Sequence, residues 1–208
     1  MIVIEDNFYP NPDEVRETAL SMFFRPGRRE RNTNFPGSRT KSTFSDENFI
    51  FCRNRWENLL NAKMQYFPAH NSNTAFTLST EKDADYNWVH HDCSGYLENT
   101  TNMMGGQAYA AVIYLSPADD LSKGTGLFRS KETGKIFKTK ELTKPLTGFK
   151  QGWTEDGMFD MHTYIGNVYN RCILYPAHYW HAPFCAGFGK DKKTGRHVQV
   201  GFFTINKK

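Results

Sequence analysis

Helical periodicity dominates the first third of the chain. Apolar residues recur at helical spacing over residues 14–22 and again over 49–64, which predicts two amphipathic helices. A short apolar run at 2–4 predicts a strand ahead of them. Between the helices, residues 25–46 are rich in Arg, Gly, Pro, Ser and Thr, a composition typical of a long surface loop. We therefore expect a helical layer in the first third of the chain.

From residue 74 onward the pattern becomes that of strands. β-Branched and aromatic residues gather in short runs between polar turns, at 74–80, 86–93, 108–115, 171–175, 179–182 and 197–205. The run at 108–115 is apolar throughout, which predicts a strand covered on both faces. Glycines in 124–129 predict a turn into a further strand. The expected fold is mainly β with N-terminal helices, a jelly-roll or cupin-like barrel.

The predicted elements fit a single domain over residues 1–208. Residues 1–73 supply its helical layer and loop, and residues 74–208 supply its β core. The polar stretch 130–166 interrupts this core and is too long for a simple turn. It is a candidate active-site flap, and a surface insertion without function is the alternative. The apolar residues expected to make its contacts on closing are Trp153, Met158 and Phe159.

Composition narrows the function classes. The net charge of +4 is too small to indicate nucleic-acid binding, and the basic cluster Arg25–Arg31 is typical of a solvated loop. The four cysteines form no CxxC pair, which argues against a structural zinc site. No apolar run approaches the roughly 18 residues of a membrane span, and Glu5 and Asp6 interrupt the apolar start, unlike a secretory leader. We expect a cytoplasmic protein with reduced thiols, in the host cytoplasm if it is viral.

The main chemical signal lies in the strand predicted at 86–93. Side chains alternate along a strand, so His90 and Asp92 share one face and His91 points the other way. With a third ligand they would form the triad of two histidines and one carboxylate that non-haem iron oxygenases use. His178 and His181, in a late turn between strands, are both candidates for that ligand. The alternative is a solvated group of polar side chains at a strand end.

Arg196 opens the last predicted strand. It shares a face with Val198, Val200 and Phe202, so its guanidinium would stand above an apolar floor. A buried guanidinium requires an anion, and its planar fork suits a carboxylate. The alternative is a strand-edge arginine in solvent, because a charged turn at 190–195 precedes it.

The order of these motifs resembles a known family. The chain is similar to the 2-oxoglutarate- and Fe(II)-dependent oxygenases, particularly small prolyl-hydroxylase-like members found in marine bacteria and their phages. The HxD motif, the later histidine and the arginine follow one another as in that family. The similarity covers most of the chain and is carried by Asp6–Arg16, Trp88–Asp92, Tyr114–Pro117, Gly124–Arg129, Asn170–Tyr175, His181 and Arg196.

The resemblance implies a double-stranded β-helix that binds Fe(II) through His90, Asp92 and His181. It implies that Arg196 binds the distal carboxylate of the cosubstrate 2-oxoglutarate. Two further candidates for contacts with cosubstrate or substrate are Tyr114 and Arg129. The implied reaction is hydroxylation of a small-molecule or peptide substrate with release of succinate and CO2, and ascorbate is compatible with it as an accessory reductant.

Two departures from the family bear on the substrate. The more familiar prolyl hydroxylases usually carry lysine where Arg196 stands, so a prolyl substrate does not follow. Residues 130–166 also exceed the connection of minimal members and are candidates for carrying specificity. Two rival functions stay open: a cupin-like metalloenzyme that does not use 2-oxoglutarate, and a non-catalytic jelly-roll binding or structural module. The sequence leaves the oligomeric state open.

Overall fold

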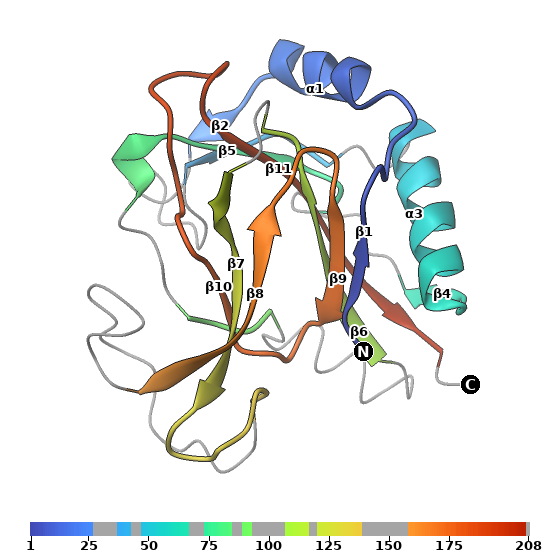
Figure 1. Ribbon diagram of the computed structural model, residues 1–208. Coiled ribbons are helices and arrows are strands. Elements are labelled where there is room, and N and C mark those ends of the chain that lie inside the picture. Colours follow the sequence, from blue (N-terminus) through green and yellow to red (C-terminus); the bar gives the residue numbers. More distant parts are fainter. Residues whose placement is uncertain are drawn as a thin grey trace.

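The computed structural model describes residues 1–26, 37–42, 47–66, 73–84, 89–92, 107–116, 120–138 and 158–206 (Figure 1). As predicted, this part of the chain is mainly β with helices near the N-terminus. No helix within these ranges is long and apolar enough to cross a membrane. The helices are α1 (Pro12–Ser21), α3 (Glu47–Leu60) and the 3-10 helix η1 (Glu81–Asp83). The strands are β1 (Val3–Glu5), β2 (Arg25–Pro26), β3 (Ser38–Arg39), β4 (Met64–Tyr66), β5 (Phe76–Ser79), β6 (Gln107–Tyr114), β7 (Asp120–Ser130), β8 (Phe159–Asn167), β9 (Cys172–Pro176), β10 (His181–Pro183) and β11 (Arg196–Ile205).

The strands form two antiparallel sheets. The large sheet has the order β1-β9-β6-β11-β5-β3-β2, and β4 also pairs with β11. The small sheet has the order β10-β7-β8. The segment Val89–Asp92 adds to the edge of the small sheet, because His90 forms an antiparallel bridge with His181 of β10.

One face of the large sheet, which we call the outer face, is covered by helices α1 and α3 (Figure 1). Strands β6, β9 and β11 present alternate side chains to these helices. Trp56 of α3 is fully buried and stacks on Phe203 of β11, with 5.3 Å between ring centroids. A Cβ atom on Gly201 would lie 2.3 Å from the Trp56 ring, so the glycine in β11 allows the helix to approach the sheet.

The opposite face of the large sheet, the inner face, packs against the small sheet. Ala108 and Ala110 of β6 lie in one apolar cluster with Leu127 of β7 and Ile165 of β8. These side chains fill the space between the sheets. The alternation predicted for the last strand holds as well, since Val198 and Val200 belong to this inner cluster. The two sheets therefore face each other as a sandwich, with the helices outside it.

Two segments predicted as loop or turn contain strands. Residues 25–46 include β2 and β3, which pair with each other and extend the large sheet from β5. Residues 124–129 lie inside β7 and do not form the expected turn. The glycines there serve close contact between strands, because a Cβ atom on Gly124 would lie 1.8 Å from the carbonyl oxygen of Ile165.

The polar stretch 130–166 ends in a strand of the small sheet. Strand β8 pairs with β7, so this end of the predicted insertion is part of the sandwich. Phe159 opens β8, is 2% exposed and packs against Trp180, which means that it is already buried without any closure of a flap. Trp153 and residues 139–157 lie outside the described part of the chain.

Candidate metal centre

His90 and Asp92 come from the short extended segment Val89–Asp92; residues 86–88 of the predicted strand lie outside the described ranges. The backbone groups of His90 exchange hydrogen bonds of 2.9 and 2.8 Å with His181. The Asp92 N–H donates to the carbonyl oxygen of Ala177 at 2.8 Å. These bonds hold the segment extended, and an extended segment sends alternate side chains to opposite sides.

The residues that alternate with the two candidate ligands face another cluster. Val89 is 2% exposed and packs with Phe128 and Trp180. The ring of His91 also contacts Trp180, with 5.1 Å between ring centroids. His91 thus points away from the side on which His90 and Asp92 meet.

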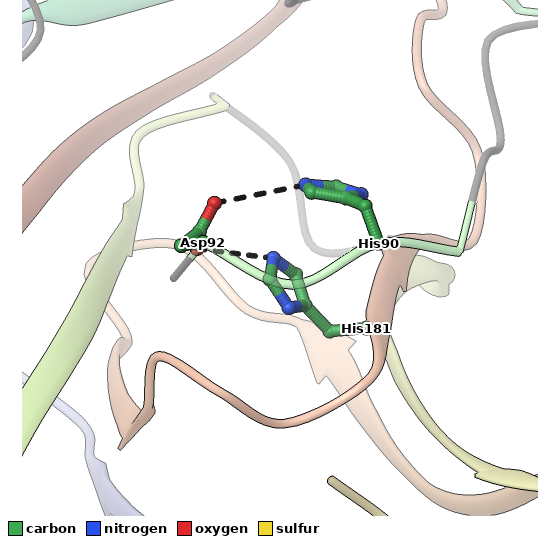
Figure 2. A group of neighbouring side chains, drawn as sticks. All are labelled: His90, Asp92 and His181. Carbon is green, nitrogen blue, oxygen red and sulfur yellow. Dashed lines mark ion pairs between the residues drawn. The ribbon is translucent and has the colours of Figure 1, made fainter. Parts of the chain in front are cut away.

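His181 opens β10 and supplies the third side chain (Figure 2). Its Nε2 lies 3.2 Å from Asp92 Oδ2, and His90 Nε2 lies 3.8 Å from Asp92 Oδ1. The three ligand atoms all lie within 4.8 Å of one another. Figure 2 shows the three side chains pointing toward a common space. Of the two histidines that the sequence left open, the structure brings His181 to the pair, and His178 instead packs against Phe137.

The carboxylate and the imidazole stabilise each other's charged forms. Burial opposes the ionisation of Asp92, but the adjacent histidines, His181 above all, outweigh it and lower the pKa of Asp92. Burial also opposes protonation of His181, and the Asp92 carboxylate overrides this and raises the pKa of His181. A divalent cation would satisfy the same carboxylate and would be bound by neutral imidazoles.

The orientation of His181 is fixed by a hydrogen bond behind the ring. Its Nδ1 lies 3.0 Å from the carbonyl oxygen of Tyr179, to which the Nδ1–H donates, so the lone pair is left on Nε2. Side-chain exposure rises from 6% for His181 to 17% for Asp92 and 49% for His90. The site therefore opens to solvent on the side of His90.

Arg196 begins β11 and is 5% exposed. Its guanidinium makes no hydrogen bond or ion pair with the described residues, and its buried Nε is without a partner there. Strand register places Ser79 of β5 opposite Arg196, and Ser79 Oγ is likewise buried without a partner in the described part of the chain. Burial lowers the pKa of Arg196. An anion at this position would satisfy both groups.

Two tyrosines accompany Arg196. The Arg196 Cζ lies 6.0 Å from the ring centroid of Tyr114, whose hydroxyl is 2.6 Å from Thr125 Oγ1. Burial raises the pKa of Tyr114 to about 12. Burial, together with the Asp92 carboxylate, raises the pKa of Tyr175 well above its ordinary value, and Arg196 acts in the opposite direction. Tyr175 therefore lies within electrostatic range of both the triad and Arg196.

Arg129, the other residue expected to contact the cosubstrate, lies elsewhere. Its side chain is exposed and approaches His162 Nδ1 of β8 at 3.3 Å, so the structure does not bring it to Tyr114 and Arg196. Conversely, sequence reasoning did not single out Ser79 or Tyr175. Both lie in runs predicted as strands, and only the register of the sheet distinguishes them from other strand residues.

The chain resembles solved structures along nearly its whole length. It is similar to the crystal structure of AviO1 from Streptomyces viridochromogenes Tue57, with a TM-score of 0.52 and 8% sequence identity, covering 98% of this chain and 89% of AviO1. The selenomethionine-labelled Fe(II)/(alpha)ketoglutarate-dependent dioxygenase TqaL matches with a TM-score of 0.40 and 8% identity, covering 99% of this chain and 82% of TqaL. No curated protein matches the sequence. The model of a family of unknown function, DUF6445, matches residues 1–206, and the chain belongs to this family.

Proposed function

We propose that the protein is a 2-oxoglutarate- and Fe(II)-dependent oxygenase that hydroxylates a small-molecule or peptide substrate. One observation carries the proposal: a triad of two histidines and one carboxylate accompanies a buried arginine that no described residue neutralises. The triad alone would fit several kinds of metalloenzyme. The buried Arg196, which acts on Tyr175 together with Asp92, favours a cosubstrate that carries a carboxylate and chelates the metal.

The proposed core is a double-stranded β-helix. In chain order, its segments are divided between the sheets: β5, β6, β9 and β11 in the large sheet, and 89–92, β7, β8 and β10 in the small sheet. The pairings β5-β11-β6-β9 in one layer and 89–92-β10-β7-β8 in the other support this proposal, because a jelly roll also divides eight strands between two sheets. In this arrangement the metal ligands come from two adjacent segments of the small sheet, and Arg196 comes from a central strand of the large sheet.

The ligand set fits Fe(II). Two imidazoles and one carboxylate on one side of the ion leave positions open for a cosubstrate and dioxygen. The lowered pKa of Asp92 keeps this ligand charged over the physiological range. The Tyr179 carbonyl holds His181 in the tautomer that presents Nε2 to the ion. Hydrogen bonds of this kind typically change metal affinity by about 10–100-fold.

The residues around Arg196 fit 2-oxoglutarate. The guanidinium would pair with the distal carboxylate, and the hydroxyl groups of Ser79 and Tyr175 are candidates for further hydrogen bonds. When bound, iron and 2-oxoglutarate supply the oxidation of an unactivated C–H bond with release of succinate and CO2. The chain itself orients the cosubstrate, neutralises its charge and, through the apolar cluster between the sheets, excludes water from that side.

Anaerobic titration of Fe(II) and 2-oxoglutarate tests the proposal. We expect the wild-type protein to bind both and to form succinate when oxygen is admitted, with ascorbate prolonging turnover by keeping iron reduced. Arg196→Gln should weaken 2-oxoglutarate binding by about 2–5 kcal/mol, since it removes one partner of a buried charge pair. Iron content should be unchanged in this variant. Arg53→Gln on α3, where the arginine side chain is 49% exposed, is the charge-matched control.

Two outcomes would contradict the proposal. Metal binding without any 2-oxoglutarate binding in the wild type would favour the cupin-like metalloenzyme. Retention of the protein's biological role after replacement of His90, Asp92 and His181 together would favour a non-catalytic jelly-roll module. Unchanged 2-oxoglutarate affinity in Arg196→Gln would remove Arg196 from the cosubstrate site.

A further inference from the structure

A second arginine lies on the inner face, outside the strands that carry the triad and Arg196. Arg39 of β3 is paired in register with Thr77 of β5, and Thr77 is paired with Val198 of β11. Residues paired directly across antiparallel strands have their side chains on the same face. Arg39 therefore shares the inner face with Val198, and its Nε donates to Thr77 Oγ1 at 3.0 Å, which orients the guanidinium.

Arg25 continues the same row of side chains. It is paired with Arg39 across β2 and β3, so two guanidinium groups project from neighbouring positions at the edge of the inner face. The Arg25 side chain is partly exposed. Like charges directly opposite each other on adjacent strands are destabilising. Two neighbouring guanidinium groups attract anions, and a bound anion would reduce the repulsion between them.

The backbone on both sides of Arg39 is held in place. Gly37 has a φ of +68°, and a Cβ atom there would lie 2.1 Å from the carbonyl oxygen of Leu78, so only glycine allows β3 to approach β5 this closely. Beyond Arg39, the Thr40 N–H donates to the Phe76 carbonyl at 2.9 Å, and Thr40 Oγ1 accepts the Phe76 N–H at 3.0 Å. A two-residue strand has few contacts of its own, and these anchors fix its register.

The charge of Asp92, one of the three candidate metal ligands, also affects Arg39. Burial of the guanidinium lowers the pKa of Arg39 to about 10, and the negative charge of Asp92 acts in the opposite direction. The residue as a whole is nevertheless partly exposed. Arg39 therefore lies partly exposed on the inner face that also carries Arg196, and the charge of Asp92 acts on it.

We propose that Arg39, assisted by Arg25, binds an oxyanion of the primary substrate, which is a small molecule carrying a carboxylate or a phosphate. The inference rests on the proposed function and narrows its substrate class. A planar guanidinium binds either group through two parallel hydrogen bonds. The site is distinct from the one at Arg196, because it is built on the edge strands β2 and β3 and not on the central strand β11.

Anion binding by metal-free protein tests the proposal. Inorganic phosphate and acetate are titrated at low ionic strength into Arg196→Met protein, in which the anion site on β11 has been removed, and arginine side-chain N–H signals are followed by NMR. We expect saturable binding of at least one anion. Adding Arg39→Gln should raise the apparent Kd by about tenfold or more, and Arg25→Gln by less. Adding Arg53→Gln, on helix α3, should leave it unchanged. The preferred anion identifies the group as carboxylate or phosphate.

Three results would overturn the proposal: no saturable binding of either anion while Arg39 is intact, equal binding after Arg39→Gln, or a loss of metal affinity in Arg39→Gln with anion binding unchanged. The last result would mean that Arg39 acts only on the Asp92 carboxylate. If Arg39→Gln does not fold, Arg39→Lys keeps the charge but removes the fork, and a several-fold weaker binding is still expected. Because neither iron nor 2-oxoglutarate is present, failure here is separate from failure of the oxygenase proposal.

Discussion

Two buried polar residues of β11, Gln199 on the outer face of the large sheet and Arg196 on the inner face, differ in their hydrogen bonds. On the outer face, Gln199 donates to Asn48 Oδ1 at 2.5 Å and to the Thr74 carbonyl at 2.9 Å. The Tyr9 hydroxyl donates to Gln199 Oε1, which completes a closed network under the helices. On the inner face, Arg196 lies only three positions before Gln199 on the same strand and has no hydrogen-bond partner among the described residues.

The difference between Gln199 and Arg196 shows that one strand can serve both fold stability and ligand binding. A closed network of buried hydrogen bonds stabilises the fold, whereas a buried polar group without a partner costs free energy until a ligand completes it. Alternation along β11 sends successive side chains to opposite faces, so both kinds of group fit into the same ten residues. We infer that Gln199 on the outer face serves stability and that Arg196 on the inner face serves ligand binding. Substitutions on the two faces should therefore have separable effects.

The largest effect on stability is expected from Trp56→Ala on the outer face. Trp56 is fully buried and stacked on Phe203, and removing a buried tryptophan side chain typically costs about 3–5 kcal/mol. Urea denaturation should show this loss, while the folded protein should keep its metal affinity. The matched control is Ile50→Ala on the same helix, where the side chain is 55% exposed and little stability should be lost. A Trp56→Ala protein that is fully folded but has lost metal binding would break the proposed separation.

A smaller effect, visible only in acid, is expected from His197 on the outer face. Burial, followed by the positive charges of Arg16 and Lys192, lowers the pKa of His197 to about 4, and an unfolded histidine titrates near 6.5. Between these values the unfolded chain binds a proton that the folded chain does not, so the free energy of unfolding should fall as pH falls. The expected loss from this group between pH 6.5 and 4.5 is about 2 kcal/mol.

The variant that isolates the His197 contribution is His197→Leu, which cannot titrate. Between pH 6.5 and 4.5, the free energy of unfolding measured in urea should fall by about 2 kcal/mol less for His197→Leu than for the wild type. The control substitution is Ile50→Ala, which removes an exposed side chain that does not titrate and should keep the wild-type pH dependence. Equal acid sensitivity of His197→Leu and wild type would show that protonation of His197 does not limit stability.

Arg196→Met should stabilise the ligand-free protein, by about 1–2 kcal/mol. Methionine fills a similar volume above Val198, and it removes a buried charge that makes no ion pair with a described residue. The same variant should lose 2-oxoglutarate binding. Thermal unfolding without ligand and anaerobic 2-oxoglutarate titration measure the two effects. A destabilised Arg196→Met protein would indicate that the guanidinium already has a stabilising role in the ligand-free fold.

The smallest effect on stability is expected from Tyr175→Phe. The Tyr175 hydroxyl makes no hydrogen bond to another described residue, so its removal should change the free energy of unfolding by no more than about 0.5 kcal/mol. The affinity for 2-oxoglutarate should fall by about two- to tenfold if the hydroxyl binds the cosubstrate. The control is Tyr169→Phe, which removes a hydrogen bond to Asp13 at 2.6 Å and should leave 2-oxoglutarate affinity intact. Unchanged affinity in Tyr175→Phe would exclude its hydroxyl from the cosubstrate site.

The parts of the fold that the sequence predicted are those with a visible period. Helices α1 and α3 and strand β11 have regular apolar spacing, and strand β6 is an unbroken apolar run. Alternation along a strand also placed His90 and Asp92 on one side and His91 on the other. The third ligand could not be chosen in this way. His178 and His181 lie in one turn, and only the bridge between His90 and His181 decides which of them reaches the pair.

The parts that the sequence did not predict have physical reasons of their own. Strands β2 and β3 are two residues long, too short to show alternation, and they depend on pairing with β5, which lies far along the chain. Strand β7 was not fully predicted because Gly124 and Gly126 suggested a turn. In the structure these glycines lie where the neighbouring β8 backbone or the Phe128 ring leaves no room for a side chain. For the same reason Arg39 and Ser79 could not be recognised, since their roles depend on which strands are neighbours.

The position of Trp180 gives the protein an optical reporter of its own metal site. Its buried indole lies against His91 and directly precedes the ligand His181 in the chain. A paramagnetic ion held by His90, Asp92 and His181 would sit close enough to quench indole emission. Trp56, stacked on Phe203 under the helices, is the other tryptophan in the described part of the chain and would report global unfolding. The sequence has two more tryptophans, Trp88 and Trp153, so all three others must be replaced by phenylalanine before the emission belongs to Trp180 alone. Fluorescence of that protein should follow metal arrival without any attached label.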